Sequence, residues 1–244
     1  MEKNKKNDYK KGLVIKQIMG INVLSASAGD VLTSIEQNIT HSNKFYVVTP
    51  NPELVLSAAK DPILKKALNS ADFPVPDGVG LKLAIPNLNI IKGRELFLEL
   101  IKLAQKNNWK VFLLGGLDNE SEIVAKKFGF EFAGGAKITS NLSKDLVNRI
   151  NKFKPDLLFV AFGNPKQEIF IYENINKLNV KGMMAVGGTF RYIAGLSKLP
   201  PKWMEKIGLE WLWRLITEPF RFKRIWNAVV VFPLQLFWYK LTNS

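Results

Sequence analysis

Four short apolar runs, each ending at Gly or Pro, constrain the fold more than any other feature of this sequence. They are "KFYVVTP" at 44–50, "WKVFLLGG" at 109–116, "PDLLFVAFG" at 155–163 and "GMMAVGG" at 182–188. Strands that are apolar on both faces are typical of a parallel sheet that helices cover on both sides. The sequence therefore predicts an α/β fold built on a Rossmann-like, doubly wound and mostly parallel sheet.

Stretches with helical spacing lie between these runs. They cover residues 52–70, 94–107, 119–128, 143–153 and 165–177. In an open α/β sheet, ligands bind beyond the carboxyl ends of the strands, where loops lead into helix N-termini. The loops that follow the strands are therefore the places where chemistry is expected.

The sequence pattern changes after residue 196. "LSKLPPKWMEKIGLEWLWRLITEPFRFKRIW" has no strand-like run, and its prolines divide it into helical segments. We expect one helix over about 203–217 and a second starting near 218, with Thr217 as its N-cap. The chain is thus predicted to have three parts, which are a basic flexible tail at 1–13, an α/β core at 14–196 and a C-terminal α-helical appendage at 197–244.

The charge balance indicates an anionic partner. The chain has 35 Lys and Arg against 21 Asp and Glu, a formal net charge of +14. Nucleic acid, phosphorylated substrates and acidic lipid all fit such a charge. Cysteine is absent and His41 is the single histidine, so no thiolate metal site, zinc site or Ser-His-Asp triad is expected. The absence of cysteine also makes the cytosol the default compartment.

Two loops carry polar residues directly after predicted strands. Thr49 and Asn51 in "VTPNPEL" can cap the following helix, and this structural role alone explains them. Asp77 in "FPVPDGVG" precedes a glycine, which is common turn chemistry. A carboxylate at the carboxyl edge of the sheet can also act as a general base, so both interpretations of Asp77 stay open.

Two further loops join a strand to a helix through glycines, in "AFGNPKQEIF" and "AVGGTFRYIAG". A helix N-terminus attracts phosphate, and a Gln side chain can pair with the edge of a uracil or a sugar. Neither loop matches the G-x-G-x-x-G or Walker pattern, so no dinucleotide or ATP site is predicted. The candidate substrate-binding residues in these loops are Gly163, Gln167, Glu168, Gly187, Gly188 and Arg191.

Taken in chain order, the motifs "TPNPE", "PDGVG", "FGNPKQE", "AVGGTF..IAG" and "GLEWLWRLITEPFR" resemble the WecG/TagA/CpsF family of bacterial glycosyltransferases. The resemblance runs from about residue 18 to residue 226. It implies an inverting transfer of an N-acetylmannosamine-type or related sugar from a UDP-sugar donor to a polyprenyl-diphosphate-linked sugar. It also implies action at the cytoplasmic face of the membrane, with no metal and no cofactor.

The resemblance assigns roles to individual residues. Asp77 matches the catalytic base, and Thr49 and Asn51 match pocket residues beside it. Gln167 and Glu168 match a Gln-Glu pair of the family. The appendage residues Arg214, Arg221 and Arg224 match arginines that hold the lipid diphosphate of the acceptor.

Two positions depart from the family pattern. Arg191 stands in "GTFRYIAG" where the family often has an acidic residue, and Ile90 stands in "IIKGREL" where it often has Arg. We therefore expect the donor side of the pocket to be remodelled, which affects the particular sugar more than the reaction type. A catalytically inactive family member that only docks to a membrane is an alternative.

The appendage mixes aromatic rings with fixed positive charges. Its apolar stretch 225–239 contains Asn, Pro and Gln and is shorter than the roughly 20 apolar residues that a membrane-spanning helix needs. Rings beside Lys and Arg are typical of a segment that lies on an anionic membrane surface. Packing as a core or oligomer helix is one alternative, and a nucleic-acid-binding module is another. For Arg214, an ion pair with Glu210 or Glu218 is a further alternative to ligand binding.

Overall fold

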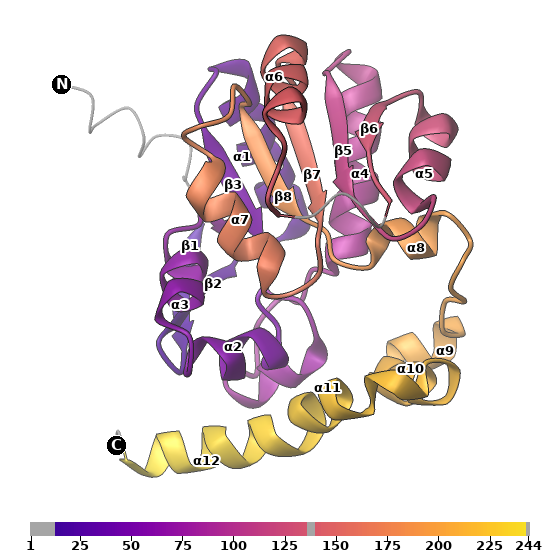
Figure 1. Ribbon diagram of the computed structural model, residues 1–244. Coiled ribbons are helices and arrows are strands. Elements are labelled where there is room, and N and C mark those ends of the chain that lie inside the picture. Colours follow the sequence, from indigo (N-terminus) through magenta and orange to yellow (C-terminus); the bar gives the residue numbers. More distant parts are fainter. Residues whose placement is uncertain (1–12, 136–139, 243–244) are drawn as a thin grey trace, which may run out of the picture.

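A six-stranded sheet forms the centre of the computed structural model, which describes residues 13–135 and 140–242 (Figure 1). Nearly all of the predicted basic tail lies outside the described residues. The strands are β3 (Phe45–Val48), β4 (Phe73–Pro74), β5 (Val111–Gly115), β6 (Glu131–Ala133), β7 (Leu157–Ala161) and β8 (Gly182–Ala185), in the order β4-β3-β8-β7-β5-β6. Every pair of neighbouring strands in it is parallel. The predicted α/β class is confirmed, and the four apolar runs form β3, β8, β7 and β5.

Helices cover both faces of this sheet and bury both sides of its central strands. Tyr46 and Val48 of β3 face one apolar cluster, while Phe45 and Val47 face the other. The first cluster contains α2 (Pro52–Ala58), α3 (Pro62–Asn69), α6 (Lys144–Phe153) and α7 (Lys166–Asn174). The second contains α1 (Ala28–Thr40), α4 (Gly93–Lys106), α5 (Glu120–Phe128) and α8 (Thr189–Ile193). Strand order reverses around β3 and β8, which is where open α/β sheets bind ligands.

The helical stretch predicted at 52–70 is two helices rather than one. Pro62 has no backbone N–H to continue a helix, and the Asp61 carboxylate accepts hydrogen bonds from the backbone N–H of Ile63 and Leu64, each at 3.0 Å. The chain therefore restarts at α3. The end of α3 holds an antiparallel hairpin of β1 (Val14–Ile18) and β2 (Ile21–Ser25), because Asn69 accepts from the Asn22 backbone N–H at 2.8 Å.

The appendage is an arm of short helices that passes along the carboxyl edge of the sheet (Figure 1). Its elements are α9 (Lys202–Lys206), α10 (Glu210–Thr217), η3 (Pro219–Arg221), α11 (Phe222–Trp226), the π-helix η4 (Asn227–Val231) and α12 (Phe232–Thr242). The predicted boundary at 196/197 falls between α8 and α9, and the division into domains stays a prediction.

Two details of the appendage differ from the expectation. The helix predicted at 203–217 is broken at Gly208, whose φ of +78° is the left-handed conformation that ends helices. Thr217 is not an N-cap, because it is the last residue of α10 and its hydroxyl donates to the Trp213 carbonyl at 2.9 Å. Glu218 instead precedes η3.

The far end of the arm packs only partly on the core. Phe232 and Leu236 of α12 are buried in the first apolar cluster. Most of their apolar neighbours on α11 and α12 are exposed, among them Phe222, Trp226 and Trp238. Within 13–135 and 140–242, no helix has both the length and the apolar character needed to cross a membrane.

Candidate active site

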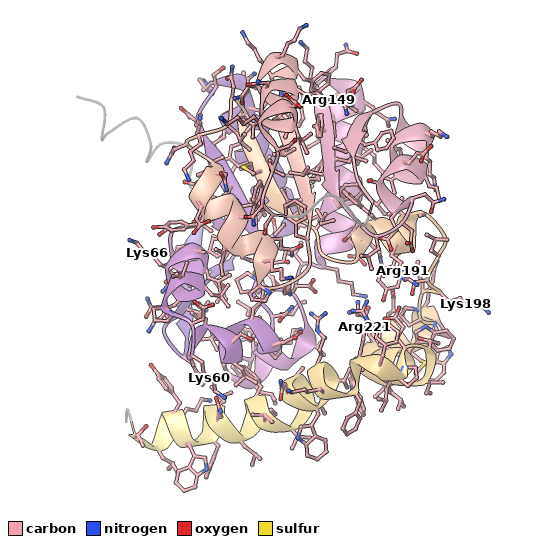
Figure 2. All side chains as sticks on the ribbon, viewed as in Figure 1. Lys60, Lys66, Arg149, Arg191, Lys198 and Arg221 are labelled. Carbon is pink, nitrogen blue, oxygen red and sulfur yellow. The ribbon has the colours of Figure 1, made fainter. Side chains whose placement is uncertain are left out.

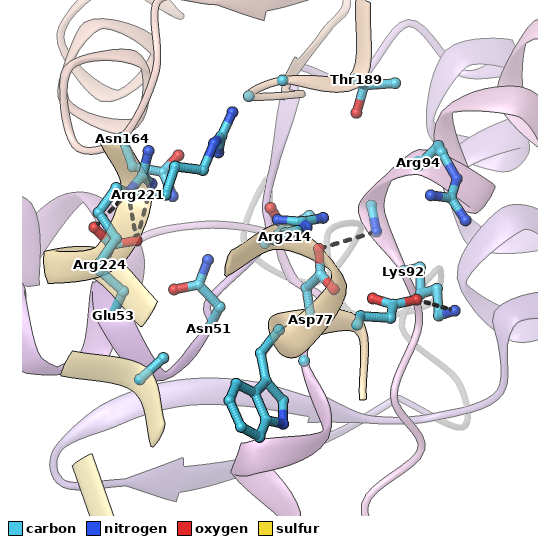
Figure 3. A pocket seen from close by; sticks show the side chains of 18 of the residues that line it. Asn51, Glu53, Asp77, Lys92, Arg94, Asn164, Thr189, Arg214, Arg221 and Arg224 are labelled. Carbon is cyan, nitrogen blue, oxygen red and sulfur yellow. Dashed lines mark hydrogen bonds and ion pairs between the residues drawn. The ribbon is translucent and has the colours of Figure 1, made fainter. Parts of the chain in front are cut away.

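A pocket of about 610 Å³ lies between the carboxyl edge of the sheet and the appendage. Loops after β3, β4, β5, β7 and β8 form one wall, and α10, α11 and η4 form the other. Figure 3 shows side chains from both walls pointing into the same space. The arm therefore completes a site that the sheet alone would leave open.

The structure brings together nearly all of the predicted site residues. The pocket is lined by Thr49, Asn51, Asp77, Gly163, Gln167, Gly187, Gly188, Arg191, Arg214, Arg221 and Arg224. Glu168 is the exception, since it is fully buried and is not part of the pocket wall. Their roles toward a ligand stay predictions.

Asp77 lies in the pocket wall on the turn between β4 and η2 (Val79–Leu83). Its Oδ2 accepts a hydrogen bond from the Gly93 backbone N–H at 3.2 Å. A Cβ atom at position 93 would lie 3.2 Å from Thr49 Cγ2 and 3.4 Å from Asp77 Oδ2, so this close approach favours glycine. Burial raises the pKa of Asp77, and the Gly93 hydrogen bond and the charge of Arg214 offset only part of that rise.

The residues on either side of Gly93 connect the core to the appendage. Lys92 Nζ lies 3.3 Å from Glu205 Oε2, and Arg94 Nη2 lies 3.0 Å from Glu205 Oε1. Lys92 also pairs with Glu210. Burial opposes the charge of Lys92, but the hydrogen bonds and charges of Glu210 and Glu205 outweigh it and raise the pKa of Lys92. No linear motif signals these contacts, because Arg94 and Glu205 are 111 residues apart.

A second connection joins α11 to the start of α2. Arg224 Nε donates to Glu53 Oε1 at 2.8 Å and to Oε2 at 3.0 Å, and Arg224 Nη2 donates to Oε2 at 2.8 Å. Glu53 directly follows Asn51 and Pro52, so the same turn carries a pocket residue and the partner of Arg224. The adjacent Arg221 pairs with Glu218, which also accepts from the Ser197 hydroxyl at 2.5 Å.

Arg214 differs from the other cations of the pocket. Among the described residues, no carboxylate oxygen lies within 4.0 Å of its guanidinium nitrogens. Its neighbours Glu210 and Glu218 pair with Lys92 and Arg221 instead. The guanidinium lies 5.6 Å from the centroid of the Tyr192 ring instead. The structure thus does not bear out the ion-pair alternative for Arg214, and this cation remains available to a ligand anion.

Gln167 and Asn51 each have a structural role in addition to their place in the pocket. Gln167 Oε1 accepts from the Gly187 N–H at 3.0 Å, and its Nε2 donates to Asn164 Oδ1 at 2.7 Å and to Glu168 Oε1 at 2.8 Å. These bonds hold the loop after β8 against the start of α7. Asn51 caps α2 as expected, because its Oδ1 accepts from the Leu54 N–H at 2.9 Å.

The unusual Arg191 is balanced by a carboxylate of the same wall. Its Nη1 lies 3.2 Å from Glu120 Oε1, and the other oxygen of Glu120 accepts from the Leu117 N–H at 3.1 Å. Ile90, the other departure, also lines the pocket. In the ranges that the structure covers, no three His, Cys, Asp or Glu side chains are grouped so as to hold a metal ion.

A carboxylate and several arginines line one pocket at the carboxyl edge of a doubly wound sheet, which is where enzymes of this architecture bind their ligands. Comparison with known proteins agrees: residues 16–244 match the sequence model of the glycosyl transferase WecG/TagA/CpsF family. The chain belongs to this family of glycosyltransferases, which confirms the resemblance in the sequence.

Two relatives are named as the same enzyme, N-acetylglucosaminyldiphosphoundecaprenol N-acetyl-beta-D-mannosaminyltransferase. The one from Staphylococcus aureus (strain MRSA252) is 32% identical over 213 residues, which cover 83% of this chain and 82% of the relative. The one from Bacillus spizizenii is 29% identical over 221 residues, which cover 86% of each.

Glu168 gives the fold a measurable pH dependence. Burial raises the pKa of Glu168 to about 7, and its Oε2 has no hydrogen-bond partner among the described residues. Because the folded state holds this proton more tightly than the unfolded state does, stability falls as pH rises from about 4.5 to about 7. We expect a slope of up to roughly 1.4 kcal/mol per pH unit in that window, and a smaller slope in Glu168→Gln.

Urea unfolding at several values from about pH 5 to about pH 8 measures this difference. Glu131→Gln is the matched control, since Glu131 is an exposed partner of Arg149. Identical pH profiles for the wild type and Glu168→Gln would contradict the raised pKa.

Proposed function

We propose that the chain transfers N-acetylmannosamine, with inversion, from a UDP-sugar to an N-acetylglucosamine linked through a diphosphate to a polyprenol. The names of the two relatives give the sugar and the acceptor. The observation that carries the proposal is the position of Asp77, which shares one pocket with Arg214, Arg221 and Arg224. A base for a hydroxyl and cations for diphosphates are the two requirements of such a transfer.

In the proposed reaction, the Asp77 carboxylate takes the proton of an acceptor sugar hydroxyl. The hydroxyl oxygen then forms a bond to the anomeric carbon of the donor as the bond from that carbon to the UDP oxygen breaks. The electron pair of the broken bond remains on UDP. The hydrogen bond from the Gly93 N–H holds one carboxylate oxygen in place, which leaves Oδ1 to act on the substrate.

Cations of the pocket stabilise the negative charge of the two diphosphates. Arg214 has no carboxylate partner among the described residues, so an incoming phosphate does not have to displace one. Arg224 is held by Glu53 through Nε and Nη2, and its Nη1 makes none of these bonds. We assign Arg214, Arg221 and Arg224 to the acceptor diphosphate, and the loops after β7 and β8 to the donor. We also predict that sugar transfer does not need a metal ion, and an activity assay in the presence of a chelator tests this prediction.

Asp77→Asn is expected to lower kcat by at least about a hundredfold while leaving the affinity for UDP unchanged, because Asn cannot accept the proton. UDP release with UDP-N-acetylmannosamine and a polyprenyl-diphosphate acceptor measures turnover, and calorimetry measures UDP binding. Undiminished turnover in Asp77→Asn would remove Asp77 from the role of base. UDP binding without turnover in the wild type would favour the inactive family member.

The pH profile gives an independent test of the same assignment. Asp77 acts as a base only when deprotonated, so its raised pKa moves the acidic limb of kcat/KM above the range of an ordinary aspartate. The limb should remain in Glu168→Gln, which removes the buried carboxyl whose pKa is raised to about 7.

Arg214→Gln is expected to lower kcat/KM for the acceptor by about ten- to a hundredfold, since a charge-assisted contact to phosphate is lost. The KM for the donor should change little. Arg149→Gln is the matched control, because Arg149 of α6 pairs with Glu131 of β6 and lies at the end of the sheet away from the appendage (Figure 2). Equal effects of the two substitutions would contradict the acceptor assignment.

Association with an anionic membrane surface is part of the proposal. Phe220, Phe222 and Trp238 are 77%, 57% and 64% exposed, and Figure 2 shows rings on the side of the arm away from the sheet. Aromatic rings beside lysines are typical of interfacial helices. We expect salt-sensitive co-sedimentation with anionic vesicles that weakens in Trp226→Ser/Trp238→Ser. Salt-sensitive RNA binding without affinity for vesicles would favour the nucleic-acid module instead.

A further inference from the structure

The wall of the active-site pocket changes from polar to apolar toward one end. Its cations and carboxylates come from the loops and helices at the edge of the sheet and from the appendage as far as Arg224, but the end between η2 and η4 is lined by aliphatic side chains. These are Val79, Leu83, Ile225, Ala228, Val229 and Pro233, which we name the apolar strip.

On the appendage, the change occurs along a single helical face. Arg221, Arg224, Ile225 and Ala228 are spaced i, i+3, i+4 and i+7, so they lie on one side of α11 and the start of η4. All four line the pocket, and Val229 and Pro233 continue the lining into η4 and α12. Cationic residues are therefore followed by aliphatic ones within about one helical turn.

The opposite wall is η2, which lies directly against the appendage. A Cβ atom at Gly80 would be 3.9 Å from the Ala228 carbonyl oxygen, and one at Gly208 would be 3.3 Å from Val79 Cγ2. Lys240 Nζ donates to the Leu83 carbonyl at 3.3 Å. Side chains of both segments thus border the same end of the pocket.

Three of the six aliphatic side chains of the strip are exposed. Leu83 is 55% exposed, Val79 48% and Val229 36%. Apolar surface left open in this way beside a charged site gains free energy when a ligand covers it. The ligand that covers it must carry an anion at one end and a hydrocarbon at the other.

We propose that the apolar strip binds the first isoprene units of the acceptor lipid, which leaves the pocket between η2 and η4. This inference rests on the proposed function, which places the acceptor diphosphate at Arg214, Arg221 and Arg224. Charge complementarity fixes the orientation of the lipid, with its diphosphate at the arginines and its chain along η4. At the α-helical rise of about 1.5 Å per residue, Pro233 lies at most about 13 Å beyond Arg224, which gives room for several prenyl carbons.

The experiment measures binding of prenyl diphosphates that carry no sugar, so that sugar transfer is not needed. Calorimetry compares dimethylallyl diphosphate, with one isoprene unit, against farnesyl diphosphate, with three. In the wild type, farnesyl diphosphate should bind at least about tenfold more tightly, because the added carbons are removed from water. In Leu83→Asn/Val229→Thr that advantage should be lost, while the affinity for dimethylallyl diphosphate stays within about twofold.

Ile63→Asn/Val14→Thr is the matched control, since both positions are exposed and lie outside the pocket. It should keep the full advantage of the longer chain. A farnesyl diphosphate analogue with a photoreactive terminal unit should label 79–83 or 225–233. Photolabelling confined to other segments, or a chain-length advantage that is equal in the wild type and Leu83→Asn/Val229→Thr, would overturn the proposal.

Equal affinity of the wild type for the two ligands would also overturn it. If the strip instead binds a second copy of the chain, Leu83→Asn/Val229→Thr would change the mass of the protein in solution and leave its affinity for farnesyl diphosphate unchanged. That result would also overturn the proposal. Failure of the proposed function can be distinguished from failure of this inference. In that case prenyl diphosphates would still bind more tightly with increasing chain length, but the transfer assay would detect no release of UDP.

Discussion

The ion pairs between the appendage and the sheet domain determine whether the pocket is a complete site. Arg224 with Glu53, and Glu205 with Lys92 and Arg94, bring residues of the arm over the carboxyl edge of the sheet. Pairs with solvent access each contribute little free energy, typically below about 1 kcal/mol. The buried Phe232 and Leu236 anchor the far end of the arm by apolar contact. Thus polar contacts hold the part of the arm that lines the pocket, and apolar contacts hold its end.

The sheet and most of its helices could be predicted from the sequence because they depend on local patterns. An apolar run such as 157–161 is buried on both faces, so neighbouring residues alone indicate its environment. Helix interruptions were harder to predict. Gly208 breaks the appendage because it adopts a positive φ, and Thr217 bonds back to Trp213 rather than capping the next element. Gly208 also lies against Val79 of the core, a contact that no local pattern reveals.

The position of the candidate site was predictable for similar reasons, but its electrostatics were not. Parallel strands bring their carboxyl ends to one edge, so the loops containing Asp77 and Gln167 were expected to meet. The partners of the cations come from distant parts of the chain, as with Glu53 and Arg224, which are 171 residues apart. Only the structure shows that Arg214 lacks a carboxylate partner among the described residues, and that Glu168 lies behind the wall.

The tripeptide Lys92-Gly93-Arg94 belongs to both halves of the molecule. Its central N–H fixes the Asp77 carboxylate, and its two flanking side chains hold Glu205 of the arm. A shift of the arm that breaks the Glu205 pairs therefore also frees the residues on either side of that N–H. Movement of the arm would thus change how firmly the Asp77 carboxylate is held, so the start of α4 couples the two walls of the pocket.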